Sequence, residues 1–456
     1  MKKIILSLCL YSLFIACSKQ QEWLDVRINR SSVVLKTLDD YQALLDADYM
    51  FREYGFLGIL GSDQINLTDA DYNAVNISTE RNGYIWAKEI YEGRMPSEWL
   101  THYRIIAVAN ICLEGLGKIP MTPQNERQWK QIQGAALFFR GLANYQLLQY
   151  FAAPYDSLKA HSDLGIPLRF SSDVNDKPGR SSVQQCYEQV LQDLQQAVAL
   201  LPENTSPAMR PSKVAALGLL SRIYLLMGNW TSAEQLSGQA LAIRSTILDY
   251  NSVNAAASLP FPTLQNQHPE VLFYAEGAVS NYFVSNRPLF DTLLYRSYAN
   301  NDLRRTVFFR LFNNQPIFKG FYTGRNMVAF AGVAVNELFL IRAESLARLG
   351  QTSAAMATLN SLLIKRWRTG SFVPLSATGP DDALVKILTE RRKELAFTGS
   401  LVWEDLRRLN RDPRFAKTLI RRLNGNTYSL PPNDPRYVLP IPEIEIQLTG
   451  IAQNIR

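Results

Sequence analysis

Two helical hairpins, each turning at a glycine, constrain the fold of this chain more than any other feature of its sequence. In the first, apolar residues recur at helical spacing over 212–227 and again over 231–243, with Gly228 between them. Two antiparallel helices can approach closely only where small residues lie at their contact, and small residues follow this turn. The residues that fit this spacing are Leu217, Leu220, Ser221 and Tyr224 before the glycine and Ala233 and Ala240 after it.

A second hairpin repeats the arrangement around Gly350. Both hairpins have the spacing of tetratricopeptide repeats, and two matches in one chain argue against chance. Because such a hairpin exposes an apolar face unless neighbours stack on it, helices near 99–150 and 181–201 should complete a curved layer. The predicted fold class is mainly α, an αα superhelix of tetratricopeptide-like hairpins with long loop excursions and a few short strands. The matching residues of the second hairpin are Phe339, Ala343 and Leu346 before the glycine and Ala355, Leu359 and Leu362 after it.

Helical periodicity and end signals predict the remaining helices. The hairpin regions lie at about 99–150, 181–243 and 335–368. Ser181 and Ser182 are candidate caps at the start of one helix. The further predicted helices cover 38–49, 99–116, 127–150, 181–200 and 381–397.

Two long segments interrupt the helices. The first excursion, 62–98, is rich in Asn, Asp, Tyr and Gly up to residue 86 and has little periodicity. The second excursion, 248–334, is rich in Pro, Asn, Ser and aromatic residues, with a short strand expected at 271–274. Long loops on a rigid scaffold tend to carry function, so we expect both excursions to lie on the ligand side. A segment at 369–379 is expected to be irregular, and a proline-rich tail at 424–442 to be extended.

The N-terminus indicates export and a lipid anchor. Lys2 and Lys3 precede an apolar run at 4–16 that is too short to span a bilayer but suits a signal peptide. The run ends at Cys17, and this order resembles a bacterial lipobox, with Phe14 where leucine is usual. Several acyl chains on Cys17 would hold the mature chain, 17–456, stably at a membrane. The alternative is an ordinary secretory signal, 1–16, with an incidental cysteine.

Charge and composition argue against a nucleic-acid partner. Lys and Arg exceed Asp and Glu by 48 to 41, and loss of Lys2 and Lys3 with the signal would lower the formal charge from +7 to +5. The basic residues are scattered along the chain, whereas a nucleic-acid binder concentrates them on one face.

Cysteine and histidine spacing predicts neither a metal site nor a catalytic triad. Cys112 and Cys186 lie in apolar helical patterns without CxxC spacing, which favours buried thiols and leaves a disulfide open. The three histidines are far apart in the sequence. No cofactor is predicted.

Motifs in a fixed order along nearly the whole chain resemble the SusD/RagB family of outer-membrane proteins. Thr398, 400–403 and 447–449 depart from the family pattern. In the N-terminal half the motif residues are Trp23, Leu24, Asp25, Trp99, Tyr103, Asn110, Arg140, Gly141, Tyr145, Tyr187, Asp193, Leu194, Lys213, Arg222, Gly228 and Trp230. In the C-terminal half they are Glu337, Arg342, Glu344, Asn360, Glu390, Arg391, Glu394, Phe397, Asp405, Leu406, Arg407, Arg408, Tyr437, Pro440, Pro442, Gln453 and Asn454.

The resemblance implies a cell-surface lipoprotein that is not an enzyme. Such a protein binds an oligosaccharide or a peptide and delivers it to a SusC-like TonB-dependent transporter in the outer membrane. Sugar recognition uses aromatic faces with polar side chains around them, so the loop aromatics are the candidate ligand contacts. Those aromatics are Tyr72, Tyr84, Trp86, Tyr282, Tyr295, Tyr298 and Tyr322, with Asn66, Asp71, Asn281 and Arg325 as polar partners. Four other tyrosines fall at helical core spacing and are excluded: Tyr103, Tyr145, Tyr187 and Tyr224.

Five charged residues near the C-terminus are expected to form an ion-pair network that holds the last helices against the hairpins. They are Glu390, Arg391, Glu394, Asp405 and Arg408.

Two rival functions remain open. A surface glycoside hydrolase would need two carboxylates facing each other across a cleft, for which Asp63, Asp69 and Asp71 are candidates. Asp-rich loops more commonly form turns and caps. The second rival is a scaffold whose helical layer grips another protein and binds no small ligand.

Overall fold

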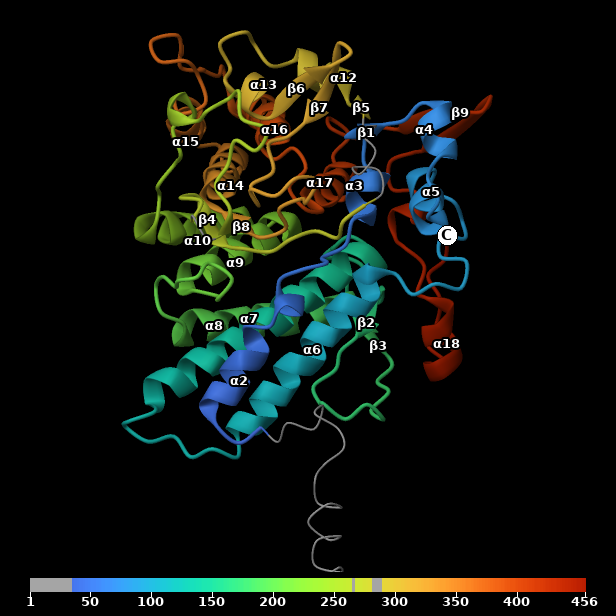
Figure 1. The fold of residues 1–456 in the computed structure, drawn as a ribbon, viewed down its shortest axis with the longest axis vertical. Helices are drawn as coiled ribbons and strands as arrows, with labels where there is room; N and C mark the ends of the chain where they lie inside the picture. Colours follow the sequence, from blue (N-terminus) through green and yellow to red (C-terminus); the bar gives the residue numbers. More distant parts are fainter. Residues whose placement is uncertain (1–34, 265–266, 281–288) are drawn as a thin grey trace, which may run out of the picture.

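The computed structural model describes residues 35–264, 267–280 and 289–456 (Figure 1). The predicted signal segment 1–16 and Cys17 lie outside the described residues, as do Asn281 and Tyr282. Within the described ranges, no helix is long and apolar enough to cross a membrane.

Helices make up most of the fold, and the strands are short and paired two by two. The helices are α2 (Leu38–Leu45), α3 (Leu57–Gly61), α4 (Asp69–Asn73), α5 (Ser78–Tyr84), α6 (Ser97–Leu116), α7 (Glu126–Phe151), α8 (Val183–Leu200), α9 (Lys213–Met227), α10 (Trp230–Ile243), α12 (Thr292–Arg296), α13 (Arg304–Val307), α14 (Val335–Arg348), α15 (Thr352–Leu363), α16 (Pro380–Glu394), α17 (Leu401–Leu409) and α18 (Glu443–Thr449). The strands are β1 (Ile65–Asn66), β2 (Leu164–Pro167), β3 (Arg180–Ser182), β4 (Val271–Phe273), β5 (Leu289–Phe290), β6 (Phe309–Phe312), β7 (Gln315–Phe318), β8 (Val333–Ala334), β9 (Leu419–Leu423) and β10 (Asn426–Leu430).

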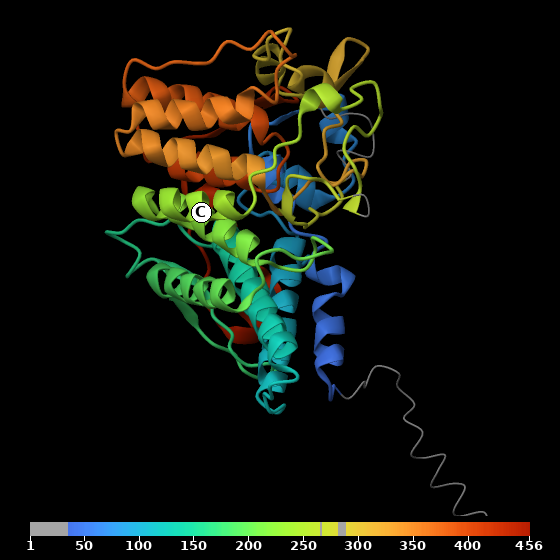
Figure 2. The same ribbon diagram turned by 90° about the vertical axis from the view of Figure 1, so that its left-hand side faces the viewer.

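The long helices stack in chain order to form one layer. Helix α7 packs against α6 and α8, α8 packs against α9, and α9 packs against α10. Helix α10 then packs directly against α14, although the second excursion separates them in the sequence, and α14 contacts α15 and α16. Figures 1 and 2 show this stack running from α6 and α7 at one end to α15 at the other. The predicted superhelix of helical hairpins is confirmed.

Both hairpins turn at the expected glycines. Gly228 and Gly350 have φ angles of 78° and 77°, which lie in the left-handed region that a side chain disfavours. The N–H of Gly228 donates to the carbonyls of Tyr224 and Leu225. These carbonyls lie at the end of α9, where helix carbonyls otherwise lack hydrogen-bond donors. Tight helix contacts follow each turn, because Ala233 and Ala355 are fully buried.

Three predicted segments differ in detail. The helix expected at 38–49 ends at Leu45, since Ala47 is extended and a separate 3-10 turn follows at Asp48–Met50. The irregular stretch expected within 62–86 contains α4 and α5, which are too short to show a period in the sequence. The tail expected to be extended begins instead with a hairpin of β9 and β10, turning at Asn424 and Gly425.

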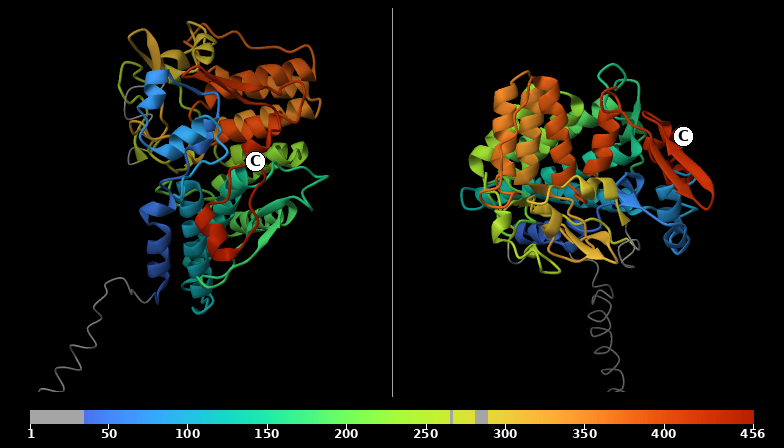
Figure 3. Two further views of the ribbon diagram at one scale, coloured as in Figure 1. Left: turned by 90° about the vertical axis from the view of Figure 1, so that its right-hand side faces the viewer. Right: turned by 90° about the horizontal axis from the view of Figure 1, so that it is seen from above.

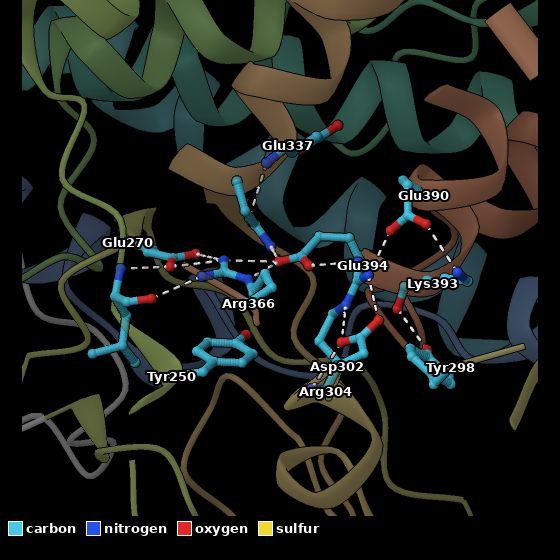
Figure 4. A network of polar contacts seen from close by, with 12 residues as sticks. Tyr250, Glu270, Tyr298, Asp302, Arg304, Glu337, Arg366, Glu390, Lys393 and Glu394 are labelled. Atoms are coloured by element: carbon cyan, nitrogen blue, oxygen red, sulfur yellow. Dashed lines mark hydrogen bonds and ion pairs between the residues drawn. The ribbon is translucent and has the colours of Figure 1, made fainter. Parts of the chain in front are cut away.

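A buried ion-pair network ties the second excursion to the helical layer (Figure 4). Arg304 binds Asp302 at 2.7 Å and Glu394 of α16 at 3.3 Å, and it also binds Glu390. Arg366, just after α15, binds Glu270 at 2.9 Å and Glu394 at 2.8 Å. Both guanidinium groups are completely buried, so each depends on these carboxylates for its stability.

A second network joins α14, α16 and α17. Arg408 binds Glu344 at 2.6 Å and Asp405 at 2.8 Å, and Arg391 binds the other oxygen of Asp405 at 2.8 Å. The predicted ionic connection between the last helices and the hairpins is therefore confirmed, in two networks. Glu390 and Glu394 belong to the network of the second excursion.

Candidate ligand-binding surface

The two excursions meet in a short antiparallel sheet. Strand β1 of the first excursion pairs with β5 of the second, with Ile65 opposite Phe290 and Asn66 opposite Leu289. The N–H of Asp291 donates to the carbonyl of Gln64 at 3.1 Å and extends the pairing. Helices α4 and α12 follow the two strands, and Figures 1 and 3 show these elements beyond one side of the helical stack. We call α4, β1, β5 and α12 together the loop surface.

Arg392 of α16 fixes both halves of the loop surface to the scaffold. Its guanidinium binds Asp63 at 2.7 Å and Asp291 at 3.3 Å, so one cation bridges the two excursions. Lys417 also binds Asp63. Burial opposes ionisation of Asp63, but Arg392 and Lys417 outweigh it and hold the pKa of this carboxyl below its usual range. Asp63 is therefore a charged structural residue.

Four of the predicted contact residues lie on the loop surface and remain accessible. Asn66 is exposed, and Asp71, Tyr72 and Tyr295 are half-buried. The Thr68 hydroxyl donates to Asp71 at 2.6 Å, within the cap of α4. The ring of Tyr72 lies 6.1 Å from that of Tyr84, and burial raises the pKa of Tyr72.

Tyr295 is supported by its own neighbours. The Arg305 guanidinium lies 5.2 Å from the centre of its ring, and the Phe309 ring meets it edge to face at 5.3 Å. Arg325 is exposed but lies outside the loop surface, where it forms an ion pair with Glu276.

Tyr84 and Trp86 do not face solvent, and their prediction as ligand contacts is corrected. Their exposed fractions are 1% and 2%. The Arg421 guanidinium lies 3.4 Å from the Tyr84 ring centre and 4.4 Å from the Trp86 ring centre. Arg421 also donates to the carbonyl of Leu60 at 2.7 Å. The two rings therefore hold a buried cation, and no face is left for a sugar.

The prediction of Tyr298 and Tyr322 as ligand contacts is also corrected, because both residues are buried. The Tyr298 hydroxyl donates to the Lys393 carbonyl at 2.8 Å, within the network of Figure 4. The Tyr322 hydroxyl donates to Glu270 at 3.1 Å and lies 2.7 Å from the Tyr250 hydroxyl. Tyr322 thus completes the hydrogen bonding of a buried carboxylate, and Tyr298 satisfies a main-chain carbonyl of α16, so both rings lie inside the protein.

The carboxylates considered for hydrolysis have structural partners. Asp63 binds two cations, as described above. Asp69 accepts the N–H of Asn424 at 2.9 Å, and Asp71 takes part in the cap of α4. Among the residues that the structure describes, no group of three or more His, Cys, Asp or Glu side chains could hold a metal ion. Cys112 and Cys186 are free and buried.

The loop surface has a neighbour that was not predicted from the sequence, the β9–β10 hairpin. Asn73 of α4 and Asn424 at the hairpin turn exchange side-chain hydrogen bonds at 2.9 and 3.1 Å. In Figure 3 the red hairpin lies beside the blue α4 and α5. Tyr428 of β10 is half-buried and close enough to Tyr72 to contribute to its raised pKa. The dipeptide Asn424-Gly425, a strong hairpin signal, could have revealed it.

Comparisons with known proteins support the predicted resemblance and fold. A SusD-like family model, described as "Starch-binding associating with outer membrane", matches residues 22–225. Over that part of its length the chain resembles the SusD/RagB family. Among curated relatives of this SusD-like chain, SusD-like protein P2 of Formosa agariphila is 26% identical over 144 residues. That match covers 31% of this chain and 26% of the relative, so the chain matches about a quarter of that protein's length.

Solved structures share the SusD-like fold over nearly the whole chain. A putative sugar binding protein from Bacteroides vulgatus has a TM-score of 0.74 at 21% identity, covering 93% of this chain and 99% of its own. A SusD superfamily protein from Bacteroides thetaiotaomicron has a TM-score of 0.71 at 23% identity, covering 92% and 100%. At these identities the likeness establishes the fold alone.

Proposed function

We propose that this SusD-like chain binds an oligosaccharide at the cell surface and passes it to a partner SusC-like TonB-dependent transporter. The observation that carries the proposal is the loop surface itself. Two excursions that are distant in the sequence pair through β1 and β5, and Arg392 bridges them to the helical layer. A binding site needs contact residues on a rigid support, and this arrangement supplies one.

The side chains of the loop surface suit a carbohydrate. An aromatic ring can stack on the apolar face of a pyranose, while amides and carboxylates bond the hydroxyl groups around it. We assign the stacking role to Tyr72 and Tyr295 and the polar role to Asn66 and Asp71. Arg325 from the second excursion is a further polar partner.

Asn281 and Tyr282, outside the described residues, complete the proposed set. They precede β5 in the sequence.

Delivery to a transporter requires that the protein stay at the membrane. We propose that Cys17 carries the lipid that anchors the mature chain to the outer membrane, because several acyl chains bind a bilayer far more firmly than one. The family description, which names an association with the outer membrane, supports this proposal.

Calorimetry on the loop-surface tyrosines tests the binding function. An oligosaccharide selected from a glycan array should bind the wild type and bind about tenfold more weakly to Tyr72→Ala or Tyr295→Ala, since a ring contact is worth about 1 kcal/mol or more. Tyr224→Ala, which removes a half-buried tyrosine from α9, is the matched control and should bind as the wild type does.

Unchanged binding in both loop variants would refute the site. Binding of peptides but no glycan would favour the peptide alternative. No ligand at all, with a transporter still co-purifying, would favour the scaffold.

A second arm of the same experiment tests delivery in the producing cell. The wild type should incorporate a clickable fatty acid and support uptake of the labelled oligosaccharide, whereas Cys17→Ala should do neither. Equal fatty-acid labelling of Cys17→Ala would contradict the anchor and leave the calorimetric result standing.

A further inference from the structure

A polar cleft of about 790 Å³ lies between α17, the connection from α7 to β2, and the C-terminal segment. It shares no residue with the loop surface. Its volume is within the range of small-molecule sites. Its lining is mostly charged or amide-bearing, and it includes Lys159, Arg180, Arg407, Asn410, Gln453 and Asn454.

Two arginines of the cleft are held by main-chain carbonyls and not by carboxylates. Arg407 donates to the carbonyls of Gln149 and Ala152 at the end of α7. Arg180 donates to the carbonyls of Gly165 at 2.8 Å and Ala452 at 3.0 Å. Within the described part of the chain, no carboxylate lies within 4.0 Å of either guanidinium. Burial lowers the pKa of Arg407 to about 10, so the group stays charged at neutral pH.

The other charges of the lining do not offset these two cations. Arg411 is neutralised by Asp156, which lies 2.9 Å away and is also in the lining. Asp434 is neutralised at 2.8 Å by Arg436, which is not a lining residue. Lys159 is exposed on the cleft wall, and Asp163 is the remaining carboxylate. Three cations therefore face one carboxylate, and the cleft has an excess of positive charge.

Unused hydrogen-bond capacity at the cleft is of the donor type. Nε of Arg407 and Nδ2 of Asn410 are buried and have no hydrogen-bond partner among the described residues. Both residues are only 3% exposed. Oδ1 of Asn410 accepts the N–H of Lys417 at 3.2 Å, which fixes Nδ2 as the free end of that amide. Tyr437 is 2% exposed, and its hydroxyl interacts with the Asn410 side chain, so both groups lie at the same place in the cleft. Buried donors without acceptors are costly, and a ligand with acceptor oxygens would satisfy them.

We propose that this cleft binds the carboxylate of an acidic saccharide, with Arg407, Asn410 and Lys159 as its recognition residues. A carboxylate supplies negative charge and acceptor oxygens together, which matches the excess of cations and the unused donors. The remaining polar side chains, Asn433, Gln453 and Asn454, suit the hydroxyl groups of sugar rings. This site is independent of the oligosaccharide site on the loop surface.

A matched pair of probes tests the charge requirement. The probes are trigalacturonate and triglucuronate, each paired with its own fully methyl-esterified form. Within each pair, acid and ester differ only at the carboxylates. In calorimetry on the whole mature chain, the free acid of at least one trimer should bind at least tenfold more tightly than its ester, and its affinity should fall as salt increases. Equal binding of acid and ester, or no binding of either acid, would overturn the proposal.

A variant on the cleft wall locates the site. Lys159→Gln removes an exposed charge without touching the core, and it should weaken binding of the acidic trimer about three- to tenfold. Lys130→Gln is the control, because the Lys130 side chain is 44% exposed, pairs with Glu126 on α7 and lies outside the cleft. Equal affinity in the two variants would place the acid elsewhere and overturn the assignment.

The loop-surface variants separate this proposal from the proposed function. Tyr72→Ala should leave binding of the acidic trimer unchanged, and Lys159→Gln should leave binding of a neutral oligosaccharide unchanged. Loss of acidic binding in Tyr72→Ala would show a single shared site and overturn the separate cleft.

Discussion

At the scale of single residues, contact with a buried charged group separates the loop aromatics that pack inside from those that stay accessible. Tyr84 and Trp86 enclose the guanidinium of Arg421, and Tyr322 bonds the buried carboxylate of Glu270. Tyr72 has no such cation on its ring among the described contacts and stays half-buried. Residue type alone does not separate these tyrosines, because each is amphipathic and can serve a core or a ligand.

Glu344 should make the stability of the protein depend on acid pH. Burial opposes its ionisation, but Arg408 and Arg348 outweigh it and lower the pKa of Glu344 to about 2. A carboxyl whose pKa is lower in the folded chain than in the unfolded chain stabilises the fold above the unfolded value of about 4.5. That contribution, roughly 3 kcal/mol, is lost as the pH falls from about 4.5 to about 2.

Urea denaturation at pH 7 and pH 3 checks this expectation. Glu344→Gln should lose stability at pH 7 and show a smaller difference between the two pH values than the wild type. Glu126→Gln, which removes an exposed partner of Lys130, should behave as the wild type does. An unchanged pH dependence in Glu344→Gln would argue against the assignment.

At the scale of elements, the two hairpins depend on a backbone conformation at the turn as well as on apolar contacts. Gly350 has a φ angle of 77°, and a Cβ added there would meet no atom within 4 Å. Only the backbone therefore resists a side chain at this position.

Gly350→Ala should lower the free energy of unfolding by about 1–2 kcal/mol, the cost of a left-handed conformation for an L-residue. Gly238→Ala is the opposite control, because Gly238 lies inside α10 and its nearest neighbour to a new Cβ is 3.7 Å away. That change should leave stability equal or raise it by up to about 1 kcal/mol. Thermal and urea denaturation measure both, and equal losses in the two variants would contradict the turn argument.

At the scale of the whole molecule, the buried charges of Figure 4 join the loops to the superhelix. Arg366 follows α15, Glu394 ends α16, and Glu270 belongs to the second excursion. One guanidinium thus connects two helices of the layer with the segment that leads towards the loop surface. The position of that surface depends on this connection.

Arg366→Gln should destabilise the protein by about 3–5 kcal/mol, because it leaves buried carboxylates without their cation. Limited proteolysis should then cut within 248–303 before it cuts the helical layer. Lys365→Gln is the neighbouring control, since Lys365 forms a pair with Asp249 at 3.1 Å in which both side chains are partly exposed to solvent, and it should cost less than about 1 kcal/mol. Similar cutting patterns for the two variants would contradict the role of Arg366.

The sequence by itself determined the long helices of the layer, the two hairpin turns and the class of fold. Helical periodicity and left-handed glycines are local properties, and residues such as Gly228 and Ala233 carry them without reference to distant parts of the chain. The order of the motifs was likewise sufficient to indicate the resemblance to the SusD/RagB family. The short helix α4 escaped detection because five residues are too few to show a period.

Only the tertiary structure decided which loop residues face solvent. β1 pairs with a strand far along the chain, and Arg421 reaches Tyr84 from a hairpin near the C-terminus. The solvent exposure of an aromatic side chain depends on which distant segment packs on it. Local sequence spacing does not predict that contact. For the same reason, the sequence did not predict the unpartnered donors of Arg407 and Asn410, because three separate segments of the chain form the cleft that they line.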